Sequence, residues 1–194
     1  MNVRRPILAL LLLTSLAGCE RAPAAAKDPP PVPGSIAPPT PKLSSFDLTD
    51  QDGQPFSSKS LKGQPWVGSF FFTQCPAVCW RLNQALAKWQ QEHPDSPIKF
   101  VSITCDPETD TPKALKQYAD HFKADPKRWT FLTGKMDYIS KVGQDMFLLA
   151  VQRGTHSSRA VVFDSTGAVR GTFDIVDPGQ FERFAALLKQ LATK

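Results

Sequence analysis

The chain has 194 residues and a net charge of +5, and 41% of its residues are hydrophobic, 21% charged and 10% aromatic. These proportions suit one ordinary globular domain and exclude a fibrous or wholly disordered protein. The positive charge is mild, and the basic residues are scattered without a cluster or a recognisable nucleic-acid module, so no nucleic-acid partner is indicated.

The N-terminus has the pattern of an export signal. Arg4 and Arg5 precede an apolar run over residues 7–17, which is shorter than the ~20 residues needed to cross a bilayer. The tetrapeptide Leu-Ala-Gly-Cys that ends at Cys19 resembles the bacterial lipobox, in which the cysteine is diacylated. We therefore expect residues 1–18 to be a signal peptide and Cys19 to anchor an extracytoplasmic lipoprotein at the periplasmic face of the membrane. A plain cleaved signal with an incidental cysteine is the alternative.

A linker follows the lipidated cysteine and reaches residue 42. Residues 20–42 contain eight of the chain's 18 prolines, many alanines and no aromatic residue, so this stretch cannot form a packed core. Such a composition favours extended polyproline II at ~3.1 Å per residue. From this linker we predict that the domain that follows it, residues 43–194, is tethered to the membrane and not embedded in it. At that length folding buries roughly 70% of the surface of the unfolded chain, which permits a single core.

The hydrophobic pattern alternates between strand and helix along this domain. Such an order predicts an α/β fold with a mixed sheet flanked by helices, which is the thioredoxin-like order with an N-terminal hairpin extension. The expected elements are a short hairpin in 45–56, a buried strand over 66–72, a helix over 76–92, a strand over 98–104, a helix from 111 with a buried stripe through Phe122, a strand over 129–132, a helix over 136–147, a hairpin of strands 159–164 and 168–173, and a last helix from Asp177-Pro178.

Cys75 and Cys79 stand where the buried strand gives way to the first helix. The free backbone N–H groups at the start of a helix stabilise a thiolate and lower its pKa. Four residues of separation put the two side chains one turn apart, ~5 to 6 Å between β-carbons, which suits either a disulfide or a shared soft metal ion. The pair is therefore predicted to be redox-active, metal-binding or both, and two structural core cysteines are the alternative.

Histidine is the usual partner of thiolate at copper, and the chain has three histidines. His93 and His121 lie near the C-terminal ends of predicted helices, where we expect solvated or capping roles. His156 lies in a polar loop before a strand, and in a thioredoxin-like sheet this loop returns beside the start of the first helix. We therefore predict His156 as the third ligand, although an isolated loop histidine more often has no such role.

The segments FTQCPAVC and SITCDPETDTP, and His156 followed about seven residues later by FDSTGAV, resemble the Sco/SenC family. Its members are thioredoxin-fold copper chaperones that help to build the dinuclear copper centre of cytochrome c oxidase. The resemblance implies that Cys75, Cys79 and His156 bind copper, as Cu(I) or Cu(II). It also implies a copper donor protein and, as client, the oxidase copper subunit or another copper-dependent protein. We expect a monomer.

Four residues depart from the family pattern or from the expected site. Trp80 stands where the family usually has proline, Ala77 where it often has aspartate, and Thr155 where an aspartate commonly precedes the histidine. These changes bear on copper affinity and partner docking. Cys105 is predicted to be a buried free thiol, with a resolving thiol or added ligand as the alternative. Asp106 and Asp110 are predicted to be turn and helix-start carboxylates, with a weaker expectation of partner contact.

Two functions remain open from the sequence. The first is a copper chaperone that uses Cys75, Cys79 and His156. The second is an enzyme, a thiol-disulfide reductase that keeps the metal-site cysteines of a client reduced with the same cysteine pair. A thiol peroxidase is disfavoured because no proline precedes Thr73 at the required spacing, and a structural zinc site is disfavoured because it needs four ligands. The histidine separates the two open functions, since thiol exchange needs only the two sulfurs.

Overall fold

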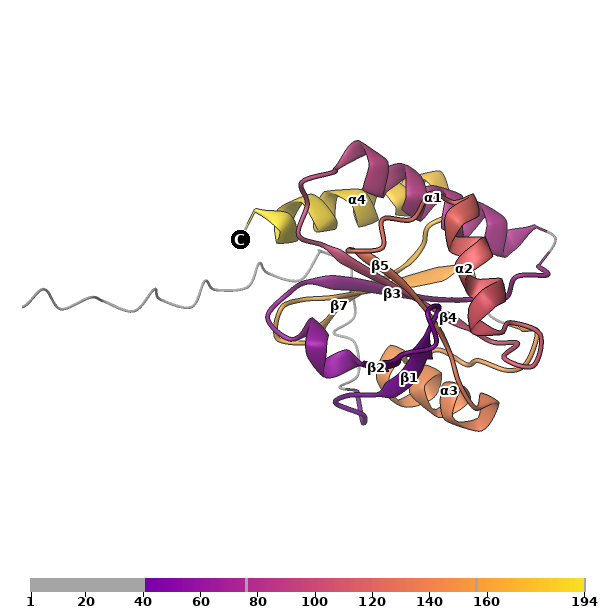
Figure 1. Ribbon diagram of the computed structural model, residues 1–194. Helices are drawn as coiled ribbons and strands as arrows, with labels where there is room; N and C mark the ends of the chain where they lie inside the picture. The colour runs from indigo at the N-terminus through magenta and orange to yellow at the C-terminus, as the bar shows by residue number, and fades with distance from the viewer. Residues whose placement is uncertain (1–40, 76, 156, 194) are drawn as a thin grey trace, which may run out of the picture.

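The computed structural model describes residues 41–75, 77–155 and 157–193. In that part of the chain seven strands form one mixed sheet, and four α-helices lie on its two faces (Figure 1). The strands are β1 (Asp47–Asp50), β2 (Pro55–Ser57), β3 (Trp66–Phe71), β4 (Lys99–Thr104), β5 (Trp129–Thr133), β6 (Arg159–Phe163) and β7 (Val169–Asp174). The helices are α1 (Val78–Glu92), α2 (Pro112–His121), α3 (Met136–Val142) and α4 (Pro178–Ala192), with a 3-10 turn η1 (Ser58–Leu61) and a π turn η2 (Gly143–Phe147).

The sheet has the strand order β2-β1-β5-β4-β3-β6-β7, with parallel strands at its centre. β3 runs parallel to β4, and β4 runs parallel to β5, whereas β6 pairs antiparallel with β3. All six residues of β3 are buried, because the strand has neighbours on both sides and helices on both faces. The register pairs Phe71 with Thr104, so the segments that carry Cys75 and Cys105 leave the sheet side by side.

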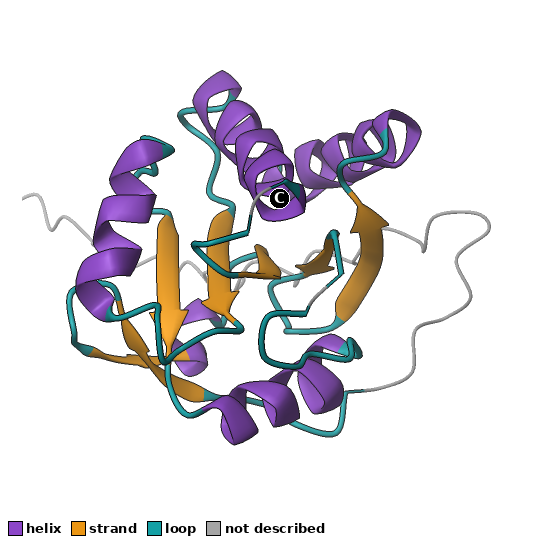
Figure 2. Cartoon of the chain, turned by 90° about the vertical axis from the view of Figure 1, so that its right-hand side faces the viewer, coloured by secondary structure: helices purple, strands orange, loops and turns teal. Residues whose placement is uncertain are grey.

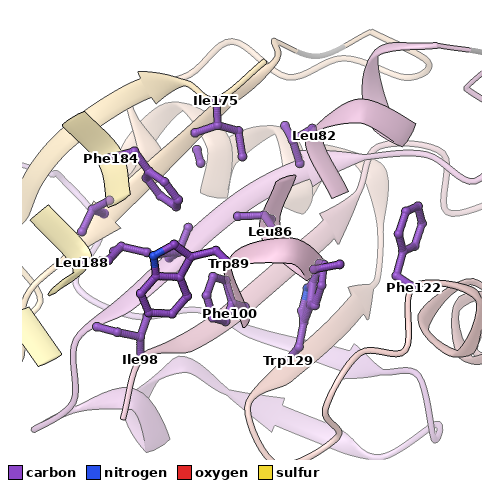
Figure 3. Packing of buried hydrophobic residues seen from close by; sticks show 14 of the residues in the cluster. Leu82, Leu86, Trp89, Ile98, Phe100, Phe122, Trp129, Ile175, Phe184 and Leu188 are labelled. Atoms are coloured by element: carbon purple, nitrogen blue, oxygen red, sulfur yellow. The ribbon is translucent and has the colours of Figure 1, made fainter. Parts of the chain in front are cut away.

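Two hydrophobic clusters cover the two faces of the sheet. Helices α1, α2 and α4 pack on one face through side chains such as Leu86, Leu115 and Phe184, and Figure 3 shows this packing. Helix α3, the two short turns and the N-terminal hairpin pack on the other face through Ile139 and Phe147, among others. Figure 2 shows the strands between these two helical layers. The predicted thioredoxin-like fold is confirmed.

Helix signals read from the sequence are also confirmed. Thr111 caps α2, since its side chain accepts a hydrogen bond from the backbone N–H of Ala114 at 3.3 Å. Asp177 caps α4 by accepting from the N–H of Gln180 at 2.8 Å. In both helices the cap is followed by a proline in the first turn, which suits this position because the N–H that proline lacks would have no partner there.

Two helix boundaries differ from those expected. Helix α1 begins at Val78 and not at residue 76, with Ala77 as an N-cap residue outside helical geometry. The helix expected over 136–147 keeps α geometry only to Val142 and continues as the π turn η2. The π turn begins at Gly143, where a β-carbon would fall 2.6 Å from the Val151 side chain, and it ends at Leu148 in left-handed geometry. The Val151 side chain therefore leaves no room for a residue larger than glycine at this position.

Several predictions concern residues outside those that the structure describes. They are the signal peptide over 1–18, the lipidated Cys19, most of the linker over 19–42, and the side chain of His156. Within residues 41–75, 77–155 and 157–193, no helix is both long enough and apolar enough to span a bilayer.

Candidate metal centre

Cys75 and Cys79 face each other across the turn that connects β3 to α1. Cys75 is half-buried, and its backbone N–H donates to the carbonyl of Phe72 at 3.2 Å, which bends the chain away from the strand. Cys79 lies in the first turn of α1 and is fully buried. Its backbone N–H donates to Sγ of Cys75 at 3.4 Å. The two thiols are thus brought together by a strand end and a helix start, as the four-residue spacing predicted.

The surroundings shift the pKa values of the two thiols in opposite directions. Burial raises the pKa of Cys75, but hydrogen bonds from the Cys79 thiol and from the N–H groups of Cys79, Ala77 and Val78 outweigh it and leave this pKa below its ordinary value. Burial, reinforced by the hydrogen bond to Cys75, raises the pKa of Cys79 far above its ordinary value. Cys75 is therefore the sulfur that ionises first, and Cys79 is the thiol that holds its proton.

The buried carboxylate of Asp110 holds the turn that carries Cys75 through hydrogen bonds. Asp110 is 0% exposed. It accepts hydrogen bonds from the backbone N–H of Thr73 at 3.1 Å, from the Thr73 hydroxyl at 2.5 Å and from the Thr104 hydroxyl at 2.5 Å. The expectation of a helix-start carboxylate understated its role, because Asp110 joins the ends of β3 and β4 to the start of α2. The signal in the sequence was a threonine just beyond one strand end and another at the end of the next strand.

Tyr118 closes the site on the α2 side. Its ring stacks on Phe71 with centroids 5.0 Å apart, and its hydroxyl accepts a hydrogen bond from the Asn83 amide at 3.1 Å. Burial raises the pKa of Tyr118, and negative charge on Cys79 and Cys75 adds to this rise. The ring therefore lies within electrostatic reach of both sulfurs and remains neutral when Cys75 ionises.

Cys105 directly follows β4 and is held by its backbone N–H, which donates to the carbonyl of Phe71 at 2.7 Å. Its side chain is fully buried in the cluster on the α3 face, whereas Cys79 belongs to the cluster on the α1 face. Burial raises the pKa of the Cys105 thiol to about 12. Among the described residues, no three His, Cys, Asp or Glu side chains converge to hold a metal ion. This packing agrees with the prediction of a buried free thiol for Cys105.

The residues that precede His156 are attached to the segment that follows β4. The backbone N–H of Gly154 donates to the carbonyl of Cys105 at 3.1 Å. The Arg153 guanidinium pairs with the carboxylates of Asp106 at 3.1 Å and Glu108 at 2.5 Å. The loop is thus attached, up to Gly154, to the segment that follows β4, which lies beside the end of β3, and the His156 side chain lies beyond the described residues.

The two other histidines occupy helix ends, as expected. His93 is the C-cap residue of α1, where its ring stacks on Trp89 at 4.4 Å and its Nδ1 lies 2.8 Å from the Trp89 carbonyl oxygen. His121 ends α2 and lies against Trp80, with ring centroids 4.6 Å apart. The rings of both histidines are therefore held by packing contacts at the ends of their helices.

Comparison with known proteins gives a consistent picture. The family model SCO1/SenC matches residues 35–192. A SCO1/SenC family lipoprotein from Bacillus anthracis is 32% identical, with a TM-score of 0.72 over 78% of this chain and 95% of that one. BsSco, a member of the Sco family of cytochrome c oxidase assembly proteins in which a disulfide switch was identified, is 25% identical, with a TM-score of 0.71 over 81% of this chain and 97% of its own.

A third similar structure contains copper. ScoI of Bradyrhizobium japonicum, with copper bound, is 29% identical, with a TM-score of 0.59 over 76% of this chain and 97% of that one. In sequence, the match covers between about a third and two thirds of the length of the curated relatives, and 49% of the SCO1 protein homolog of Bacillus subtilis.

Proposed function

Because the chain belongs to the SCO1/SenC family, we propose that it is a metallochaperone, which carries copper as its cargo for the dinuclear copper site of cytochrome c oxidase. Cys75, Cys79 and His156 are the proposed ligands. The observation that carries the proposal is the 3.4 Å hydrogen bond from the Cys79 N–H to Sγ of Cys75, which brings two thiols together in a half-buried turn.

The chemistry of this donor set fits copper. Thiolates are soft ligands that select Cu(I), and an imidazole extends the set to Cu(II). Cys75 has a pKa below its ordinary value, so part of the deprotonation needed for metal binding is already favoured. The copper-bound ScoI structure supports copper as the cargo of this family.

The anchored loop supports His156 as the third ligand. Gly154 is hydrogen-bonded to Cys105, whose own N–H is bonded to Phe71 at the end of β3. Two residues of chain reach at most ~7 Å beyond Gly154. His156 therefore belongs to a segment attached at the C-terminal ends of β3 and β4, and Cys75 and Cys79 follow the end of β3.

A lipid anchor completes the proposal. We propose that residues 1–18 are removed, that Cys19 is diacylated, and that the linker to residue 42 holds domain 43–194 near the outer side of the membrane. Two acyl chains give stable anchoring where one does not, and the similar Bacillus anthracis protein is a lipoprotein. Cys19→Ser should release the protein from the membrane fraction, and retention in that fraction would contradict the anchor.

A thiol-disulfide reductase is the second candidate. It is favoured by the opposite pKa shifts of Cys75 and Cys79, because a reductase needs one sulfur as thiolate and the other as a protonated thiol that acts second. The disulfide switch of BsSco points to the same chemistry in a related protein. Both candidates use the same pair, so His156 is the residue that separates them.

Copper titration of the reduced protein tests the two candidates together. We expect about one copper per chain and a thiolate-to-Cu(II) charge-transfer band in the visible spectrum. His156→Ala should abolish the band and leave the rate of disulfide reduction in a model substrate unchanged, and His121→Ala is the matched control that should change neither. A band that survives in His156→Ala would remove this residue from the ligand set. An absence of copper binding together with intact disulfide reduction would favour the reductase.

A further inference from the structure

The surface beside the cysteine pair exposes large apolar side chains. In the described part of the chain, the large hydrophobic residues that remain exposed are Val78, at 42%, and Trp80, at 38%. They flank the fully buried Cys79 in the first turn of α1. Two residues apart, they point to different sides of the helix, and Trp80 is the one that lines a hollow of the surface.

The Trp80 ring is held in place by its neighbours. It packs against the rings of His121 at 4.6 Å and Phe122 at 4.9 Å, both at the C-terminal end of α2. Phe122 is itself almost fully buried and lies at one side of the cluster in Figure 3. A partner that binds this indole therefore meets a side chain that is already ordered, which reduces the entropy lost on binding. Tryptophan is also among the residues that most often dominate the binding energy of an interface.

A hollow of about 440 Å³ lies between α1 and the end of α2, next to Trp80. Its apolar part is formed by Trp80, Ala87 and Phe122, and its charged part by Lys88 and Lys123. Among the described residues that line this hollow, none is an aspartate or a glutamate. The hollow therefore combines room for one apolar side chain with two ammonium groups beside it, of which Lys88 also forms an exposed ion pair with Glu92 at 3.8 Å.

A second hollow, of about 380 Å³, lies on the other side of the exposed ridge of α1. It shares Gln84 and Lys88 with the first hollow. Arg81 adds a further cation to this hollow, and Ile175 and Phe181 are among its apolar residues. The described residues that line it again include no aspartate or glutamate. We call the two hollows and the ridge between them, Arg81 to Lys88, the α1 surface.

We propose that the α1 surface docks an acidic segment of the client protein that also carries an aromatic or large aliphatic side chain. The apolar side chain fills the hollow beside Trp80, and flanking carboxylates pair with Lys88, Lys123 and Arg81. The identification of this partner with the copper client rests on the proposed function. The chemistry of the segment follows from the surface itself, where the two hollows are lined by cations and apolar groups and the exposed Glu92, paired with Lys88, lies outside the lining.

The position of the surface suits transfer at the thiols. Val78 and Lys88 are ten residues apart in α1, which corresponds to ~15 Å along the helix. A segment of about five extended residues spans that length at ~3.3 Å per residue. A client bound along the ridge therefore has the continuation of its chain next to Cys75, which is half-buried at the start of the helix.

Two other occupants fit the surface less well. A second copy of the chain would present the same cations and repel the first. The chain's own linker contains no aromatic residue, and Asp28 is its one carboxylate besides Glu20. Neither supplies an acidic segment with a large apolar side chain.

A peptide titration of the full-length reduced protein tests the proposal. The probe is a short capped peptide with one phenylalanine flanked by glutamates, and amide shifts of the protein are followed by NMR. We expect shifts over Trp80 to Lys88 and around Lys123 that weaken with added salt. Peptides with lysine in place of glutamate, or alanine in place of phenylalanine, should bind at least tenfold more weakly.

Variants localise the contact. Trp80→Ala should weaken binding of the glutamate peptide at least tenfold, as expected for an interface anchor, and Lys123→Glu should weaken it severalfold. Lys59→Glu, in a separate hollow near η1, is the matched control and should leave binding unchanged. Equal binding of the lysine peptide, unchanged binding by both surface variants, or a concentration-dependent dimer that displaces the peptide would each overturn the proposal. Copper titration of the same sample reports on the proposed function separately, because peptide binding does not need the metal.

Discussion

Asp110 accepts hydrogen bonds from both the backbone N–H and the hydroxyl of Thr73, at 3.1 and 2.5 Å, across 37 residues of sequence. Thr73 is two residues before Cys75 in the turn that presents the thiol. The carboxylate is fully buried, so these hydrogen bonds form in a region without competing water, where they are strongest. The conformation of the thiol turn therefore depends on a residue at the start of a different helix.

Asp110→Asn should destabilise the protein and loosen this turn. The amide group keeps the volume of the carboxylate but places N–H donors against the donors of Thr73 and Thr104. We expect a loss of about 2 kcal/mol in the free energy of unfolding, measured by urea denaturation. Alkylation of Cys75 should become slower, because a looser turn no longer holds the sulfur against the N–H groups that favour its thiolate. Asp95→Asn, at an exposed position, is the control and should change neither quantity. Full stability in Asp110→Asn would show that the network does not support the turn.

The pH dependence of thiol alkylation should distinguish the two cysteines. Cys75 has a pKa below its ordinary value and Cys79 one far above it. Alkylation of the native, metal-free protein should therefore modify Cys75 first, with a half-maximal rate at a pH below the ~8.5 of an ordinary cysteine. Mass spectrometry of the peptides identifies the modified residue. Faster modification of Cys79 than of Cys75 would contradict the assigned roles.

Stability should fall in alkaline solution, and Cys105 contributes to this fall together with the other buried thiol, Cys79. The unfolded thiol ionises above pH ~8.5, whereas the folded thiol stays protonated up to about pH 12. The folded state then binds more protons than the unfolded state, so the free energy of unfolding decreases as the pH rises above ~8.5, by at most about 1.4 kcal/mol per pH unit for this thiol. Cys105→Val should reduce this slope in urea denaturation at pH 8 to 10. An unchanged slope would mean that the thiol is not held protonated in the folded protein.

Arg153→Ala should weaken copper binding with little effect on stability. The ion pairs of Arg153 with Asp106 and Glu108 are partly exposed, so their loss should lower the free energy of unfolding by less than ~1 kcal/mol. The loop before His156 loses an attachment, however, and we expect a severalfold lower Cu(II) affinity in the proposed site. The control is Lys116→Ala, which removes the exposed ion pair to Asp52 and should leave the affinity unchanged. An unaltered Cu(II) affinity in Arg153→Ala would show that this attachment does not position the ligand.

Two glycine substitutions should act in opposite directions. A β-carbon at Gly143 would lie 2.6 Å from the Val151 side chain, so Gly143→Ala should destabilise the protein by about 1 to 3 kcal/mol. At Gly179, in the first turn of α4, the nearest atom to such a β-carbon is 3.6 Å away. Gly179→Ala should therefore stabilise the protein, by roughly 0.5 kcal/mol. Thermal denaturation of the two variants beside the wild type measures both effects, and the same sign for both would contradict the packing described at Gly143.

Much of the fold could be predicted because its signals are local. The apolar run from Trp66 to Phe72 marked a buried central strand, which the structure shows over Trp66–Phe71, and Thr111 and Asp177, each followed by proline, marked two helix starts that the structure confirms. The placement of Cys75 and Cys79 at a strand-to-helix junction followed from the same local patterns. The end of the third helix did not, because the apolar period continues through Phe147 although the backbone leaves α geometry after Val142.

By itself, the sequence determined the order of strands and helices and the cysteine pair at the junction of β3 and α1, since hydrophobic period, capping residues and four-residue spacing act between neighbours in the chain. Only the tertiary structure decided that Asp110 is a buried acceptor beneath the thiol turn, that Cys105 packs on the opposite face of the sheet from Cys79, and that Trp80 stays exposed against the end of α2. The physical reason is that burial and hydrogen-bond partners depend on which distant segments meet. A residue's identity does not specify those contacts.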